Sequence, residues 1–435
     1  MKVAIAGYGI EGKASFAYWS ALGANVVIAD ERAALVDAPE GSELILGSDA
    51  FSQLSDFDIV VRSPSISPRK LAYKDKVWSA TNEFFAKCPA PIIGVTGTKG
   101  KGTTCSLITS ILRAAGKNVH LVGNIGTPAL DILASITSDD IVIYELSSFQ
   151  LWDLRVSPHI AVILAIEPDH LDVHSDFDDY LTAKGAIRKH QGPDDICYYH
   201  PTNEFSRQIA TVGNWPEDEY EQKVWQAQAF RYATQEAVYV QDGNFMSGSS
   251  VICSTGAVRL PGNFNIENAC AAISAARNFT LDSDTIEQGL RAFTGLPHRL
   301  KFVTEKNGIS YYDDSIATTP GSAIAAMRSF DAPKVILLGG SNKGADYHEV
   351  VAVAKETGTK VVAIGQTGAR IKEICDEIGV ESLREEGLMP RVIAAANNLA
   401  EPGSVVILSP ASASFDQYKS YSDRGDQFIA AVEEL

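Results

Sequence analysis

The stretch Ile92-Ile93-Gly94-Val95-Thr96-Gly97-Thr98-Lys99-Gly100-Lys101-Gly102-Thr103-Thr104 joins an apolar run to a glycine-rich turn, and a helix is expected to follow over residues 105–115. Backbone N–H groups of such a turn, together with the N-terminus of the following helix, can hold phosphate groups. Lys101 can reach the outer phosphates of a bound nucleotide. The stretch therefore predicts an α/β domain with a phosphate-binding loop.

This loop departs from the common GxxxxGK[ST] spacing at two positions. Val95 stands at the first glycine, and Gly102 stands where a hydroxyl would bind Mg²⁺. Thr103 or Thr104 would have to supply that oxygen, or water would.

Two later apolar runs end in side chains that can bind a metal. Residues 140–144 lead into Glu145, and residues 160–166 lead into Glu167-Pro168-Asp169-His170. Taken singly, Glu145 is a strand-end surface carboxylate and His170 a loop histidine. An open parallel sheet, however, binds ligands at the carboxyl ends of its strands. Because Mg²⁺ takes few protein ligands when phosphates are present, the two side chains together predict a magnesium site beside the loop.

Length and composition narrow the class of protein. The 435 residues suggest three domains at about 150 residues each. With 37 Lys+Arg against 54 Asp+Glu, the net charge is −17, which argues against a nucleic-acid partner. Six dispersed cysteines indicate buried thiols in a reducing compartment. No signal peptide and no run near the ~18 apolar residues of a membrane span are seen, so we expect a cytoplasmic protein without a membrane partner.

Alternating strand-like and helical segments predict an α/β fold with three tandem domains. The N-terminal domain is expected over residues 1–89, a central domain over 90–296 and a C-terminal domain over 297–435. Short β-branched runs separated by helices indicate parallel sheets. Only the stretch Ala227–Leu260 has the pattern of antiparallel strands.

The N-terminus carries a second glycine motif, Gly7-Tyr8-Gly9-Ile10-Glu11-Gly12, and Asp30 ends the next strand. Alone, this is a Rossmann signature for NAD, with Asp30 on the ribose hydroxyls. A nicotinamide-dependent dehydrogenase is therefore one alternative. The same helix N-terminus can equally hold the diphosphate of a UDP-sugar.

Taken together, the motifs resemble the Mur ligase family of ATP-dependent amide-forming enzymes. The resemblance rests on the glycine loop, GNIGTPAL (123–130), ELSSFQL (145–151), EPDHLDVH (167–174), FNIENA (264–269) and LPHRL (296–300). Within the family, ELSSFQL, DDSIATTPGS (313–322), GGSNKGADY (339–347) and the segment 408–428 are most similar to the member that adds glutamate. The resemblance covers essentially the whole chain.

The resemblance implies a Rossmann-like UDP-binding domain, a P-loop ATPase-like central domain and a Rossmann-like C-terminal domain that binds glutamate. It also implies a two-step reaction. ATP phosphorylates the carboxylate of UDP-N-acetylmuramoyl-L-alanine, and the amine of glutamate attacks the acyl phosphate. Two Mg²⁺ ions, a carbamylated Lys184 and a monomeric enzyme of peptidoglycan precursor synthesis belong to the same expectation.

The resemblance also implies roles for individual residues. Lys101, Glu145, His170 and Lys184 are expected to be catalytic, with Thr103, Glu145, His170 and Lys184 at the metal ions. The expected ATP contacts are Gly97, Thr98, Lys99, Gly100, Lys101, Gly102, Thr103, Thr104, Asn265, Asn268, Arg299 and Asp314. The expected contacts to the UDP-substrate are Gly9, Ile10, Asp30, Arg32, Ser63, Asn124 and Ser147. The expected glutamate contacts are Thr318, Lys343, Ser414 and Tyr421.

Two residues depart from the family pattern. Glu11 places a carboxyl group near the expected diphosphate, and Ile316 stands where close relatives often carry a lysine. Residue types do not distinguish D-glutamate, which we expect, from L-glutamate. A folylpolyglutamate-type ligase is a further alternative, which the N-terminal glycine motif argues against.

Overall fold

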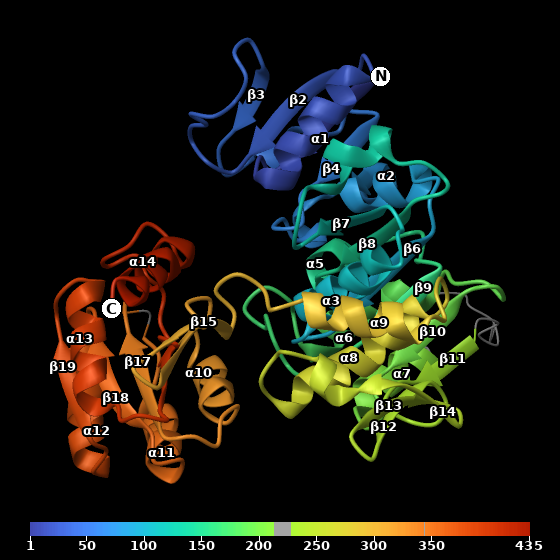
Figure 1. The fold of residues 1–435 in the computed structure, drawn as a ribbon. Helices are drawn as coiled ribbons and strands as arrows, with labels where there is room; N and C mark the ends of the chain where they lie inside the picture. The colour runs from blue at the N-terminus through green and yellow to red at the C-terminus, as the bar shows by residue number, and fades with distance from the viewer. Residues whose placement is uncertain (213–227, 343) are drawn as a thin grey trace. The chain divides into compact units, whose positions relative to one another are not determined.

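The computed structural model describes residues 1–212, 228–342 and 344–435 (Figure 1). The chain divides into two compact units. The first consists of Met1–Ala257 with Glu267–Ala292, and the second of Val258–Ile266 with Phe293–Leu435. The first unit contains two parallel sheets and a small antiparallel sheet, and the second unit contains one mainly parallel sheet.

The N-terminal sheet of the first unit has five parallel strands in the order β3-β2-β1-β4-β5. Its elements are β1 (Lys2–Ala6), α1 (Ile10–Ala21), β2 (Asn25–Asp30), β3 (Glu43–Leu46), η1 (Ala50–Gln53), β4 (Ile59–Arg62), η2 (Pro68–Lys70), η3 (Lys74–Lys76), β5 (Val77–Ser79) and α2 (Ala80–Lys87). The strand order reverses between β1 and β4. Ligands of such sheets bind at this switch point, and both the Gly7–Gly12 turn and Ser63 follow these two strands.

The central sheet has six parallel strands in the order β11-β10-β9-β6-β8-β7. Its strands are β6 (Ile92–Thr96), β7 (Val119–Gly123), β8 (Ile141–Glu145), β9 (Ile160–Ile163), β10 (Ile196–Tyr199) and β11 (Gln228–Arg231), and the helices are α3 (Lys101–Ala114), α4 (Ala129–Ile132), η4 (Leu133–Ser135), α5 (Ser148–Leu151), α6 (Phe177–Lys189), α7 (Glu204–Thr211), α8 (Asn263–Ala276) and α9 (Ser283–Ala292). Strand β6 lies between β8 and β9. The phosphate loop therefore opens between the ends of the two strands that were expected to carry metal ligands.

The predicted antiparallel stretch is partly wrong. Strands β12 (Val238–Gln241), β13 (Asn244–Ser247) and β14 (Ser250–Ser254) do form an antiparallel sheet, followed by η5 (Thr255–Ala257). Strand β11, at the start of the stretch, instead pairs in parallel with β10 at the edge of the central sheet. The connection from β10 to β11 contains α7 and is long enough for a crossover between parallel strands. A short hairpin turn could join only antiparallel strands.

The N-terminal sheet and the central sheet of the first unit are joined by one hydrophobic cluster. Phe84 and Phe85 of α2 are buried in one cluster with strand residues such as Val142 and Tyr144 of the central sheet. The Phe84 and Tyr144 rings lie 5.6 Å apart. Helix α2 thus follows the last strand of the N-terminal sheet but packs on the central one. The domain boundary at residue 89 remains a prediction.

The sheet of the second unit has six strands in the order β15-β16-β20-β17-β18-β19. Within this sheet, only β15 runs antiparallel to its neighbour. Its elements are β15 (Lys301–Lys306), β16 (Ile309–Asp313), α10 (Pro320–Met327), β17 (Lys334–Gly339), α11 (His348–Glu356), β18 (Lys360–Ile364), α12 (Gly368–Ile378), β19 (Ser382–Glu385), α13 (Met389–Leu399), β20 (Val405–Leu408) and α14 (Tyr421–Glu433). Alternate residues of β17 face opposite sides, so Ile336 packs with α10, α11 and α12, and Leu337 packs with α13 and α14.

These sheets confirm the predicted α/β fold class with parallel sheets. All six cysteines are free, and five of them are buried, as expected for small apolar side chains. Among the residues the structure describes, no helix is long and apolar enough to cross a membrane.

Candidate active site

The phosphate loop has the backbone that its glycines predict. Gly97 and Gly100 have φ of 148° and 86°, which side chains other than hydrogen rarely allow. Gly100 is the N-cap of α3, so the first N–H groups of the helix, which have no partner within the helix, lie at the loop. A Cβ at Gly100 would lie 2.7 Å from Oδ1 of Asn268. The structure thus brings Asn268, an expected ATP contact, directly against the loop.

Two lysines meet on one side of this loop. Lys101 Nζ donates to the carbonyl oxygens of Gly97 and Thr98, both at 3.1 Å. Lys184 of α6 donates to the same Gly97 carbonyl at 2.8 Å and is buried. Burial and, secondarily, the charge of Lys101 hold the pKa of Lys184 well below its usual range. The solvated helix lysine that its sequence context suggests is therefore a buried amine at the phosphate loop.

Two carboxylates act electrostatically on Lys184. Glu145 is buried at the end of β8, and Asn124 donates to its Oε1 at 3.0 Å. Asp169 and Glu145 both act on Lys184 by raising its pKa, against the larger effect of burial. The structure thus places Asn124 against Glu145, and the Glu145 charge acts on Lys184. Asp169, which lies inside the quoted EPDH segment, was not among the expected site residues, although its charge acts on Lys184.

Hydroxyl groups at the start of α3 complete an oxygen-rich site. Thr103 and Thr104 are both buried, and the Thr104 hydroxyl has no hydrogen-bond partner. Mg²⁺ prefers oxygen ligands and takes only one or two carboxylates when it also binds phosphate. The Glu145 carboxylate with a threonine hydroxyl fits that donor set. In the described part of the chain, no three His, Cys, Asp or Glu side chains gather into a metal-binding group.

His170 lies in the loop after β9 with φ of 55°, and its ring lies 5.0 Å from that of Phe149. His174, which sequence reasoning passed over, is buried behind it. Its Nε2 pairs with the Ser148 hydroxyl at 3.0 Å and its Nδ1 with Asp179 at 2.9 Å. Burial lowers the pKa of His174 more than Asp179 raises it. The hydrogen bonds of His174 thus connect the loop that carries His170 to the start of α5.

The N-terminal glycine turn is closely packed. Gly7 has φ of 89°, and a Cβ at Gly12 would lie 2.2 Å from the Gly7 carbonyl oxygen. Asp30 accepts from the Tyr8 backbone at 2.8 Å and from the backbone and guanidinium of Arg32. Hydrogen bonds from Arg32 lower the pKa of Asp30 to about 2. Since both carboxylate oxygens are engaged by protein donors, Asp30 is poorly placed to accept ribose hydroxyls, which weakens the NAD alternative.

Glu11 turns away from the expected diphosphate position and into the protein. Its Oε1 accepts from Gln150 Nε2 at 2.6 Å, and burial raises its pKa to about 7. Gln150 in turn accepts from the backbone and hydroxyl of Ser147, the N-cap of α5. The departure at Glu11 thus connects the glycine turn to Ser147, an expected substrate contact.

Substituting Gly12 with alanine is expected to destabilise the first unit by about 1–3 kcal/mol, because the new methyl group overlaps a fixed carbonyl oxygen. Gly9→Ala is the matched control: nothing lies within 4 Å of its Cβ, and the expected change is below about 0.5 kcal/mol. Urea unfolding of both variants measures the difference. Equal midpoints for the two would contradict the close approach.

The second unit holds its expected residues at the ends of β16 and β20. Asp314 accepts from Leu300 N and from the Ser409 hydroxyl, and burial raises its pKa to about 7. Arg299 acts on the same carboxyl group electrostatically. Ile316 donates its backbone N–H to the carbonyl of His298, while the His298 ring pairs with Asp313 at 2.6 Å. Asp314 and Arg299 are therefore neighbours, and their shared role in nucleotide binding remains a prediction.

The expected glutamate contacts are only partly described. The Ser414 hydroxyl is buried without a partner, whereas Thr318 and Tyr421 are exposed. Tyr421 begins α14, and its carbonyl accepts from Ser315. Lys343 lies outside the described residues. The backbone pairing of Ser341 with Ala413 brings the loops after β17 and β20 together.

Comparison with known proteins identifies the family. The model of the Mur ligase middle domain matches residues 95–276, and that of the Mur ligase, glutamate ligase domain matches residues 298–412. The UDP-N-acetylmuramoylalanine–D-glutamate ligase of Streptococcus sanguinis strain SK36 is 34% identical over 455 residues, covering 100% of this chain and 97% of that relative. This protein belongs to the Mur ligase family. The ligase of the same name from Pelotomaculum thermopropionicum is also 34% identical and covers 99% of this chain and 97% of its own.

Solved structures agree at the level of the fold. UDP-N-acetylmuramate–alanine ligase from Thermotoga maritima superimposes with a TM-score of 0.59 at 16% identity, over 100% of this chain and 99% of that one. FolC from E. coli, solved with ADP, gives a TM-score of 0.56 at 19% identity, over 82% and 91%. The Mur ligase resemblance read from the motifs is confirmed, and with it the expectation of an ATP-dependent ligase.

Proposed function

We propose that this Mur ligase joins D-glutamate to UDP-N-acetylmuramoyl-L-alanine. The observation that carries the proposal is the identity of about one third over the full chain with ligases of that name. A carboxylate oxygen of the alanyl group attacks the γ-phosphorus of ATP and ADP leaves. The glutamate amine then attacks the acyl carbon, phosphate leaves, and the amine loses a proton as the amide forms.

The first-unit geometry suits the phosphoryl step. This step needs positioning and charge neutralisation more than covalent chemistry from the protein. Lys101 and the N–H groups at the start of α3 would bind the phosphates of ATP, with Asn268 beside the loop. Glu145, His170, a threonine hydroxyl and a carbamylated Lys184 would hold two Mg²⁺ ions, which neutralise phosphate charge when bound. Asn265, Arg299 and Asp314 are the further proposed nucleotide contacts.

The sugar nucleotide would bind over the Gly7–Gly12 turn. Ile10, at the start of α1, is 76% exposed and therefore accessible to a ligand at the glycine turn. Arg32 binds the Tyr8 carbonyl in the glycine turn and the Asp30 carboxylate, and about half of its side chain is exposed. We assign the uracil ring to Ile10 and Arg32, the diphosphate to Gly9 and Ser63, and the sugar end to Asn124 and Ser147.

Glutamate would bind in the second unit at the loops after β17 and β20. The buried, unpartnered Ser414 hydroxyl provides a donor for a carboxylate. Lys343, Thr318 and Tyr421 complete the proposed set.

Release of ADP tests the proposal. Purified protein with ATP and Mg²⁺ is expected to form ADP only when UDP-N-acetylmuramoyl-L-alanine and glutamate are both present. D-glutamate and L-glutamate are assayed in parallel, and turnover with the L-enantiomer alone would overturn the stereochemical assignment. ADP release driven by a folate with glutamate, or oxidation of NADH, would favour the alternatives instead.

A further inference from the structure

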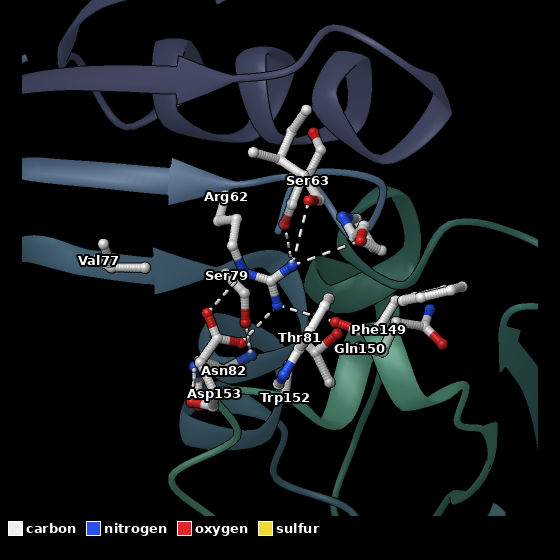
Figure 2. Close-up of polar contacts among 12 residues, drawn as sticks. Arg62, Ser63, Val77, Ser79, Thr81, Asn82, Phe149, Gln150, Trp152 and Asp153 are labelled. Carbon is white, nitrogen blue, oxygen red and sulfur yellow. Dashed lines mark hydrogen bonds and ion pairs between the residues drawn. The ribbon is translucent and has the colours of Figure 1, made fainter. Parts of the chain in front are cut away.

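Arg62 is a charged side chain buried at the seam between the two sheets of the first unit. It is the last residue of β4, and its side chain is fully shielded from solvent. Figure 2 shows its guanidinium between the 63–66 turn and the segment that contains Phe149 and Asp153, with dashed lines to both sides. All three guanidinium nitrogens donate hydrogen bonds.

On its own side of the seam, Arg62 holds the turn that follows β4. Nη1 donates to the Ile66 carbonyl at 2.9 Å, with longer contacts to those of Ser63 and Pro64. Ser63 donates its hydroxyl to the Gly7 carbonyl, and a Cβ at Gly7 would lie 2.9 Å from the Ile66 side chain. The guanidinium therefore supports the turn on which the N-terminal glycine motif is built.

On the other side, Arg62 binds the segment that begins at the N-cap of α5. Nη2 donates to the Phe149 carbonyl at 2.8 Å, and Nε and Nη2 bind the Asp153 carboxylate at 2.8 and 2.7 Å. Asn82 of α2 also fixes Asp153, because its side-chain amide donates to the Asp153 backbone carbonyl at 2.9 Å. One side chain thus joins the Ser63 turn to the short helix whose N-cap is Ser147.

Stability is a weak reason for such a pair. A buried ion pair recovers its desolvation cost only in part, and an apolar pair of similar size is often equally stable. A bidentate Arg–carboxylate pair, by contrast, fixes both distance and orientation. The geometry accordingly favours a role in holding two segments in register.

We propose that Arg62 and Asp153 are a positioning pair that sets the distance between the protein segments that bind the diphosphate and the sugar of the UDP-sugar substrate. This inference rests on the proposed function, in which Ser63 lies at the diphosphate and Ser147 near the sugar. Neither residue touches substrate. A substrate long enough to contact both Ser63 and Ser147 depends on their separation, whereas UDP alone would contact the glycine turn and Ser63 but not Ser147.

The test uses Arg62→Met, Asp153→Leu and the double variant in the full chain. Each single variant leaves a buried group without its partner and is expected to lower the Tm, while the double variant recovers much of that loss. In the double variant, KM for UDP-N-acetylmuramoyl-L-alanine is expected to rise about 10- to 100-fold. The Kd of UDP measured by calorimetry is expected to rise much less than this KM, because UDP meets the Ser63 turn but not Ser147. KM for ATP is expected to stay within about twofold to threefold of wild type.

Arg155→Met is the matched control, because Arg155 crosses the same seam but holds β5, donating to Val77 at 3.1 Å. Its KM for the UDP-sugar is expected to remain that of wild type. A folded double variant with unchanged KM, or an equal loss of UDP and full-substrate affinity, would overturn the positioning role. If wild type itself does not use the UDP-sugar, the proposed function fails instead, so the two failures are distinguishable.

Discussion

Replacing Lys101 with alanine is expected to lower kcat for ADP formation by about a thousandfold, the largest effect of any single substitution in the phosphate loop. Lys101 Nζ donates to the Gly97 and Thr98 carbonyls of the loop, whose remaining donors include backbone N–H groups at the start of α3. Phosphoryl transfer builds negative charge on the oxygens of the transferred group, and a fixed cation stabilises that charge more in the transition state than in the ground state. Backbone N–H groups remain in the variant, so ATP binding should weaken much less than kcat.

The measurement is a steady-state ADP assay with ATP varied, together with a nucleotide-binding titration. Lys117→Ala is the control. Lys117 is exposed just beyond the C-terminus of the same helix, so this variant loses the same unit of charge from the chain without touching the loop. Near-normal kcat in Lys101→Ala, or an equal loss in Lys117→Ala, would contradict a local role for the Lys101 cation.

The local features of the site could be predicted from the sequence. Gly97, Gly100 and Lys101 lie within a few residues of one another, and their spacing alone specifies a turn with positive φ before a helix. Glu145 was predictable for a similar reason, since a carboxylate after a buried strand lies at the ligand-binding edge of a parallel sheet. Parallel sheets themselves follow from β-branched runs alternating with helices.

Pairings between distant segments could not be predicted. The sequence suggests that the Glu11 carboxylate would repel a bound diphosphate. In the structure its carboxyl group instead accepts a hydrogen bond from Gln150, 139 residues away. Arg62 and Asp153, 91 residues apart, form a buried pair that no local pattern indicates. Strand β11 was misassigned because its partner is set by a crossover through α7 rather than by its own residues. Such contacts depend on how helices pack, which residue spacing does not encode.

The state of Lys184 is the second prediction with a large expected effect. The amine is fully buried, lies at 2.8 Å from the Gly97 carbonyl and lies over the Tyr180 ring. Carbamate formation needs a neutral amine, whose lone pair bonds to the carbon of CO₂ while one proton is lost. Burial lowers the pKa of Lys184, so the neutral fraction grows as the pH rises and is far larger than for an exposed lysine at the same pH. A carbamate would place two oxygens near Glu145 and Asp169, a set that suits Mg²⁺.

Lys184→Ala is accordingly expected to lower kcat by about a hundredfold to a thousandfold. Short carboxylates such as acetate or formate, at tens of millimolar, are expected to restore part of the activity by placing an anionic group in the vacated space. Wild-type activity should also fall when dissolved CO₂ is removed and return with bicarbonate, more strongly at low pH, where less of the amine is neutral. Lys189→Ala, on the same helix, serves as the control and should show neither loss nor rescue. Two results together would contradict the carbamate: a folded Lys184→Ala enzyme that carboxylates do not reactivate, and wild-type activity that does not depend on CO₂. Lys184 would then be an amine that supports the Gly97 turn through its hydrogen bond.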